Sequence, residues 1–280
     1  MSLAEETEAG STEFRDRLLA LVGDHGGDTA RAFAAAYVRR LSTDGISAEH
    51  LAAEVLGAYG FANERGRAPV GVRAFNPTLD EDGYEPLGSV VETNTDDWPF
   101  LVDSVSAALE RRGERIARLV HPIIGISRED GHISSVSHAR NAVRRESVMH
   151  YDLARKLTDR ELEELERDIK SVLLAVRSTV TDFGAMTQRV EAMIGLARKA
   201  SSRYDSDDVR EAVDFLAWLL RGNFVLLGAR EYEIRDDAYR CIPAPAWASS
   251  PTRSARPTRS PSRCRSSASA SARWRHPASC

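Results

Sequence analysis

The spacing of apolar residues predicts a helical segment at the start of the chain. Apolar side chains recur every three or four positions there, as they do along one face of an amphipathic helix. Phe14, Leu18, Leu21 and Val22 form the first such face. The predicted helices cover residues 12–22, residues 29–41, and a third stretch from Ser47 to between Gly57 and Gly60.

Strand patterns follow this helical segment. Val148, His150 and Asp152 alternate with apolar neighbours, which is the period of a half-buried strand. Pro122 lies inside another run and predicts a bulge or an edge position, because proline donates no ladder hydrogen bond. A helical face from Pro99 to Gly113 interrupts the strands. The predicted strands are 69–77, 89–95, 115–128, 131–138 and 147–155.

Long helices come next. Thr158 and Glu161 have the spacing of a capping box, and an apolar stripe follows them to residue 180 and continues through residues 183–200. Asp208 and Glu211 predict a second capping box, whose helix ends at Gly222. Residues 223–235 then predict a strand, and residues 236–243 its hairpin partner.

The order of these elements predicts an α+β fold. Strands that largely follow one another, separated by two long helices, are typical of an α+β sandwich. The order contains a ferredoxin-like βαββαβ unit with one extra strand.

Composition places the chain among ordinary globular proteins. It has 280 residues, of which 42% are hydrophobic and 29% are charged. There is no apolar run of 18 residues, and the acidic start has no apolar signal region, so we expect a cytoplasmic protein with no membrane partner. Three cysteines without metal-ligand spacing predict neither a disulfide framework nor a zinc site.

Charge is divided unevenly along the chain. Residues 1–243 carry 31 basic and 42 acidic side chains, whereas residues 244–280 carry seven arginines and no acid. The acidic body argues against a nucleic-acid partner. The last 37 residues are almost entirely Ala, Ser, Arg and Pro, which predicts disorder. A shifted reading frame of GC-rich codons would explain this composition, and a natural RNA-binding tail is the alternative.

One polar cluster at a predicted strand-to-helix junction is a candidate effector-binding or structural loop. A helix start offers backbone N–H groups to an anion, but neighbouring aspartates would repel it. The simpler interpretation is that one aspartate caps the helix while Phe100 and Leu101 enter the core. The candidate residues are Asn94, Thr95, Asp96, Asp97 and Asp103.

The sequence predicts no catalytic, cofactor-binding or metal-binding residue. It contains no Gly-x-Gly-x-x-Gly, Walker or Gly-x-Ser-x-Gly motif. His132, His138 and His150 lack the close spacing of a helical metal pair. His121, in an apolar run, is expected to be a buried, hydrogen-bonded side chain or a strand-edge residue.

Four strings occur in the order of a known family. ETNTDDWPFLVDSV, LVHPIIGISREDGHI, ESVMHYDL and EAVDFLAWLLRGNFVLLGAREYEI resemble the N-terminal region of the large bacterial NAD-specific glutamate dehydrogenases. The resemblance covers about residues 14–243. It implies an ACT-like regulatory fold, with NAD as cofactor and oxidative deamination of L-glutamate to 2-oxoglutarate in the full-length enzyme. The family's catalytic portion lies downstream, so we expect this chain to be inactive alone and to bind no cofactor itself.

The resemblance predicts a truncated regulatory or architectural fragment of that enzyme, with an amino acid as candidate effector and self-association through an incomplete second unit. The alternatives are a free-standing amino-acid sensor and, less favoured, an RNA-binding adaptor. The predicted parts are a helical preface (1–65), an ACT-like α+β domain (66–180), a helical connector (181–222), the start of a second ACT-like unit (223–243) and a disordered tail (244–280).

Overall fold

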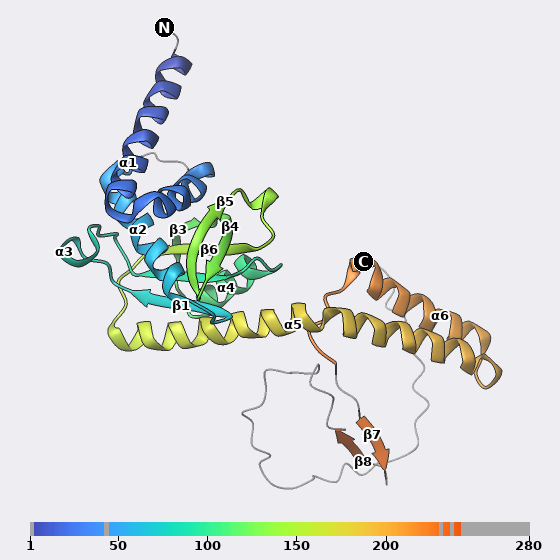
Figure 1. Ribbon diagram of the computed structural model, residues 1–280. Coiled ribbons are helices and arrows are strands. Elements are labelled where there is room, and N and C mark those ends of the chain that lie inside the picture. The colour runs from blue at the N-terminus through green and yellow to red at the C-terminus, as the bar shows by residue number, and fades with distance from the viewer. Residues whose placement is uncertain (1–2, 42–44, 230–231, 236–237, 242–280) are drawn as a thin grey trace. The chain divides into compact units, whose positions relative to one another are not determined.

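The computed structural model describes residues 3–41, 45–229, 232–235 and 238–241 (Figure 1). The predicted disordered tail, with its RNA-binding and frame-shift interpretations, lies outside the described residues. Among the described residues, no helix combines the length and the apolar character that crossing a membrane requires.

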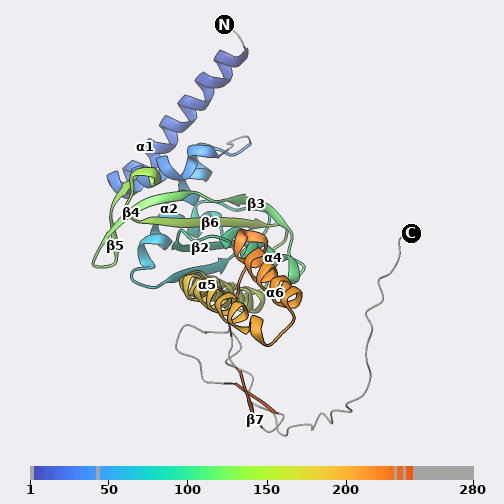
Figure 2. The same ribbon diagram turned by 90° about the vertical axis from the view of Figure 1, so that its right-hand side faces the viewer.

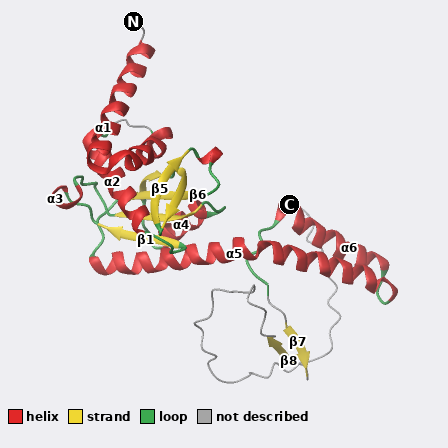
Figure 3. Ribbon diagram, viewed as in Figure 1, coloured by secondary structure: helices red, strands yellow, loops and turns green. Residues whose placement is uncertain are grey.

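The main sheet contains six strands, and every pairing in it is antiparallel. The order is β1-β2-β6-β4-β5, and β3 also pairs with β6. Helices and strands are distinguished by colour in Figure 3. The strands are β1 (Val70–Phe75), β2 (Val90–Asp96), β3 (Ile116–Val120), β4 (Ile123–Glu129), β5 (His132–Ser137) and β6 (Arg145–Leu153).

This topology confirms the predicted α+β, ferredoxin-like fold. Strand β2, helix α4 (Leu101–Arg111), the interrupted strand β3–β4, strand β6 and helix α5 (Asp159–Lys199) follow the βαββα order, and β5 is the extra strand, paired with β4. In a complete βαββαβ unit, the strand after the second helix lies beside the first strand. Here β1, which precedes the unit, occupies that edge next to β2.

The strand predicted over residues 115–128 is two strands. His121 and Pro122 separate β3 from β4, and the two strands pair with opposite halves of β6. Proline has no N–H to donate, so the ladder breaks there. The Pro122 carbonyl still accepts a hydrogen bond from the Val148 N–H at 3.1 Å, which holds the break against β6.

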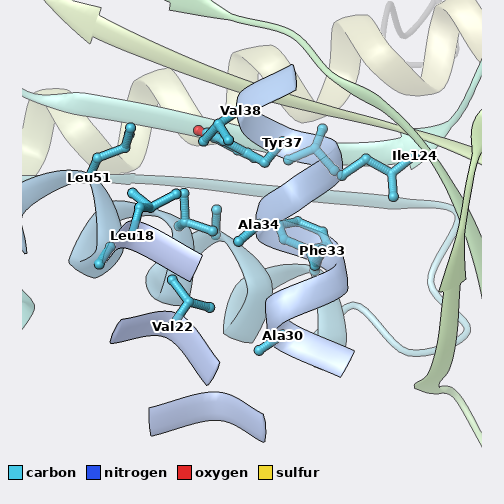
Figure 4. Packing of buried hydrophobic residues seen from close by; sticks show 14 of the residues in the cluster. Leu18, Val22, Ala30, Phe33, Ala34, Tyr37, Val38, Leu51 and Ile124 are labelled. Atoms are coloured by element: carbon cyan, nitrogen blue, oxygen red, sulfur yellow. The ribbon is translucent and has the colours of Figure 1, made fainter. Parts of the chain in front are cut away.

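Helices α1 (Leu3–Tyr37) and α2 (Ala48–Glu64) pack on one face of the sheet (Figure 2). Their apolar side chains meet inward-facing residues of β4, β5 and β6. Figure 4 shows this packing around Phe33, Leu51 and Ile124. The helical N-terminal segment therefore shares a core with the sheet.

Helices α4 and α5 cover the opposite face. Val91, Met149, Tyr151 and Leu153 of the sheet share a second core with them. Strand β6 is consequently buried on both faces from Glu146 onwards, and the prediction of a half-buried strand was wrong. The alternation was read correctly, but the polar face of β6 is covered by α2 rather than by water.

The two predicted helices over residues 12–22 and 29–41 correspond to two helical segments of α1, which meet at a break at Gly27. There φ is +75° and ψ is −173°, which is not a helical conformation. Glycine adopts this conformation without the steric cost that a side chain would add.

The first predicted capping box is confirmed and the second is wrong. Thr158 and Glu161 exchange hydrogen bonds with each other's backbone N–H at the start of α5. Helix α6 (Ser206–Trp218) instead begins after Asp205, whose carboxylate accepts from the Asp207 N–H at 2.8 Å. Asp205 lies close enough to cap the helix first, so Asp208 falls inside the first turn.

The strand predicted over residues 223–235 is shorter than expected. Residues 224–229 form no strand, and only β7 (Tyr232–Arg235) pairs with β8 (Ala238–Cys241).

The boundary predicted between residues 180 and 181 lies inside α5, and the division into domains stays a prediction. The remaining short elements are α3 (Leu79–Asp82), the 3-10 turns Val38–Arg40, Ala139–Asn141 and Ala200–Ser202, and a π-turn at Leu219–Asn223 that contains Gly222.

Candidate functional site

A cavity of about 510 Å³ opens where five chain segments meet. Its walls come from the end of α2 and the loop after it, the end of β2, the turn between β4 and β5, the loop before β6, and α5. We call this cavity the arginine pocket, because five arginines line it. They are Arg65, Arg67, Arg128, Arg144 and Arg177.

Glu146 holds the back of the arginine pocket together. Its carboxylate accepts hydrogen bonds from Arg128 at 2.8 and 2.9 Å and pairs with Arg65 at 2.7 Å. All three side chains are buried, with exposed fractions of 0% for Glu146, 6% for Arg128 and 2% for Arg65. Burial alone would raise the pKa of Glu146, but the hydrogen bond from Arg128 and the charge of Arg65 hold the pKa below its usual value.

The two buried arginines also bind backbone carbonyls. Arg128 donates to the carbonyls of Gly131 and Ala62 at 2.8 and 2.7 Å, which ties the β4–β5 turn to the end of α2. Burial lowers the pKa of the Arg65 guanidinium, and its Nε has no hydrogen-bond acceptor among the described residues. Arg65 and Arg128 thus form a fixed wall whose donors are largely occupied.

The arginines at the mouth of the pocket are held more loosely. Arg144 is 57% exposed and lies 3.3 and 3.4 Å from the carboxylate oxygens of Asp96. Arg67 approaches Asp130 only to 3.9 Å, and both are exposed. Arg177 on α5 is exposed and forms no ion pair within the described part of the chain. Exposed guanidinium groups of this kind are available to an incoming anion.

The pocket carries an excess of positive charge. Its five arginines face Asp96 and Asp130 in the lining and Glu146 behind it, which leaves a formal charge of +2. Such an excess favours anions over neutral or cationic ligands.

Glycine lets two backbone segments approach each other at the pocket. Gly131 in the β4–β5 turn has a φ of +93°, and a Cβ placed on it would lie 3.3 Å from the Cα of Gly66. A side chain at position 131 would therefore push the turn away from the loop after α2.

The candidate loop residues from the sequence are only partly brought together. Asp96 lines the arginine pocket, and Asn94 lies behind it, where its amide oxygen is 3.4 Å from Arg128. Thr95 is buried in β2, and its hydroxyl donates to the Asp96 carbonyl. Asp97 pairs with Arg145 at 3.2 Å, and Asp103 is exposed in the first turn of α4, outside the pocket lining.

The expected aspartate cap of α4 is absent. The N-cap residue is Phe100, which makes no side-chain capping bond, has a φ of +69° and is 46% exposed. Leu101 does enter the core, as expected. The tight turn after Pro99 places Phe100 in the capping position, so its side chain points away from the core that Leu101 joins.

A second ionic cluster lies on the same face of β6, and the histidine at its centre is closed to solvent. His150 is fully buried, with Nδ1 3.0 Å from Glu92 and Nε2 3.1 Å from Asp152. Burial lowers the pKa of His150, but Glu54, Asp152 and Glu92 together outweigh it and raise the pKa to about 10. His150 is therefore an imidazolium at neutral pH.

Arginines complete this second cluster. Arg118 pairs with Glu54 of α2 and with Asp152, and Arg73 donates to Glu92 at 2.6 Å. His150 and these two arginines match the three carboxylates in charge. We interpret the cluster as an ionic tie between α2 and the sheet, because its charges are paired with one another and its central histidine is inaccessible.

The important polar residues of both clusters were missed by sequence reasoning. Glu146, His150 and Asp152 occupy alternate positions of β6, on the same face as Val148. Val148, an apolar residue on this otherwise polar face, was the signal in the sequence that the face is covered.

His121 behaves as expected: it is half-buried, and its Nε2 lies 2.8 Å from the Ser147 hydroxyl. Within the described ranges, no group of side chains is arranged to hold a metal ion.

Comparison with known proteins identifies the region that carries the arginine pocket. Residues 33–169 match the family model described as the ACT1 domain of glutamate dehydrogenase. This part of the chain belongs to the glutamate dehydrogenase ACT1 family. The ACT1 region includes β1 to β6 and four of the five pocket arginines, whereas Arg177 follows it in α5.

Three relatives are named NAD-specific glutamate dehydrogenase. The protein from Halomonas elongata is 36% identical over 174 residues, which cover 60% of this chain and 11% of the relative. The Pseudomonas aeruginosa protein is 30% identical over 244 residues, covering 83% and 15% respectively. The Mycobacterium tuberculosis protein is 28% identical over 162 residues, covering 56% and 10%. The chain thus spans only a small share of the length of these relatives.

Proposed function

We propose that this chain is a regulatory region of an NAD-specific glutamate dehydrogenase and that it responds to an amino-acid effector. The observation that supports this most directly is the position of the arginine pocket. The pocket is built largely by the ACT1 region, and its exposed guanidinium groups are suited to binding the carboxylate of an amino acid.

The site favours binding over catalysis. The two most buried arginines are fixed by Glu146 and by backbone carbonyls, those of Gly131 and Ala62 for Arg128 and those of Ala68 and Pro69 for Arg65, so they form a rigid wall. The other described residues of the lining supply charged groups and small side chains, and no nucleophile stands beside a general base among them. In this proposal the chain binds an effector and transmits its presence, and another part of the enzyme performs the reaction.

NAD does not fit the described residues. A dinucleotide site uses a glycine-rich turn between a parallel strand and a helix. The main sheet is antiparallel, and the turn from β2 to α4 consists of Asp97, Trp98, Pro99 and Phe100. We therefore place the cofactor of the proposed full-length enzyme on another part of that protein.

The proposal is tested by measuring the thermal unfolding of the purified chain with a panel of L-amino acids. A ligand that binds only the folded state raises the unfolding temperature as its concentration passes Kd. We expect at least one amino acid to produce a saturable increase. If none does at millimolar concentration, the effector role is wrong.

A further inference from the structure

We propose that the arginine pocket is a binding site for a small dicarboxylate, held between Arg144 and Arg177. This inference rests on the proposed function and specifies the class and the position of its effector. It begins from the difference between the occupied arginines at the back of the pocket and the available ones at its mouth.

The occupied arginines define where the ligand cannot bind strongly. Arg128 gives its donors to Glu146 and to two backbone carbonyls, and Arg65 is paired with Glu146 at 2.7 Å. Both are buried and fixed. They contribute positive potential to the pocket, but most of their hydrogen-bonding capacity is already used.

The available arginines come from different elements. Arg144 belongs to the loop before β6 and Arg177 to the middle of α5. Arg177 forms no ion pair with any described residue, and Arg144 contacts Asp96 only through exposed bonds of 3.3 and 3.4 Å. A guanidinium presents parallel N–H donors that match the two oxygens of a carboxylate, so two guanidiniums offer two carboxylate sites.

Charge and size narrow the ligand class. The formal charge of +2 that the arginines leave over the three carboxylates complements a dianion. The cavity of about 510 Å³ lies in the range of small-molecule sites, and none of the described residues that line it is an aromatic side chain that could stack on a ring. A compact ligand with two carboxylates satisfies both conditions, whereas an apolar ligand or a nucleotide base does not.

Asp96 competes with a ligand carboxylate for Arg144. It pairs with Arg144 and also lies 3.6 Å from Arg65. A ligand carboxylate that takes Arg144 would leave Asp96 beside Arg65, so the displaced aspartate keeps a cationic neighbour. This exchange lets the pocket open for a ligand without leaving a carboxylate unpaired.

The test is isothermal titration calorimetry of the full chain with succinate, butyrate, L-glutamate and inorganic phosphate at low ionic strength. The variant replaces both mouth arginines (Arg144→Gln and Arg177→Gln). The matched control replaces two exposed arginines outside the pocket (Arg111→Gln and Arg167→Gln) and changes the net charge equally. Unfolding midpoints in urea establish that both double variants are folded.

We expect succinate and L-glutamate to bind the native chain and the control equally and butyrate to bind more weakly. Loss of two charge-assisted contacts should weaken succinate binding to the pocket variant by about tenfold or more. If the pocket variant binds succinate as tightly as the native chain does, the ligand does not bind between Arg144 and Arg177, and this inference is wrong while the effector role stands. Phosphate binding without succinate binding would overturn the dicarboxylate class. If none of the probes and no amino acid binds, both this inference and the proposed function are wrong.

Discussion

Replacing Glu146 with glutamine should destabilise the fold strongly, because it removes one carboxylate from between two buried cations. Arg65 and Arg128 are only 2% and 6% exposed, so water cannot replace the lost partner. Removing one member of a buried ion pair typically costs about 3–5 kcal/mol. For a domain of roughly 150–250 residues this corresponds to a decrease in Tm of about 6–20 °C.

Urea denaturation followed by circular dichroism measures this loss directly. The control is Glu164→Gln, which removes exposed contacts with Arg160 and Arg112 at 3.0 and 3.5 Å and should cost less than about 1 kcal/mol. The reasoning is refuted if Glu146→Gln costs no more than this control. Because the pKa of Glu146 is lowered in the folded state, its contribution is present above its unfolded pKa and is lost as pH falls through the folded value. The difference between the native chain and Glu146→Gln should therefore shrink in acid below about pH 4.5.

Three further predictions concern other features of the fold. His150→Gln should flatten the pH dependence of the free energy of unfolding. The raised pKa of about 10 means that the histidine's contribution to stability is full below about pH 6.5 and is lost as pH rises through 10. Urea midpoints of the native chain and the variant at pH 6 and pH 9.5 measure this difference. Gly131→Ala should destabilise the folded chain by at least about 1 kcal/mol, because φ at this position is +93°. The control Gly184→Ala, inside α5, should leave stability unchanged or increase it, and equal effects of the two substitutions in thermal unfolding would contradict this reasoning. Val225 and Leu227 are exposed apolar residues, and replacing both with serine should reduce concentration-dependent self-association in size-exclusion chromatography; an unchanged elution profile would show that they do not mediate it.

Elements whose structure depends on residues close together in the sequence could be predicted from local patterns. The stripe that begins at Leu162 and the reciprocal bonds of Thr158 and Glu161 are set within a few turns of helix, so α5 was predicted correctly. Strand β2 lies within one residue of its predicted bounds. The predicted fold class followed from the order of such elements.

Features that depend on contacts between residues far apart in the sequence could not be predicted from local patterns. The placement of β1 at the sheet edge requires its register with β2, and the second buried face of β6 requires α1 and α2 to dock there. The arginine pocket collects residues from Arg65 to Arg177, separated by more than a hundred positions. The sequence singled out Asp96 as a polar loop residue, but nothing local showed which cations would face it.

The most direct test of the account is a chimera with the Pseudomonas aeruginosa relative. The segment of that enzyme that aligns with this chain, at 30% identity, is replaced by the present sequence through α5. Glutamate-dependent NAD reduction is then measured across a range of succinate concentrations, with and without Arg144→Gln and Arg177→Gln. The account predicts an active chimera whose response to succinate changes when the two arginines are replaced. An active chimera that responds to succinate identically with and without the two replacements would contradict a regulatory role for the arginine pocket.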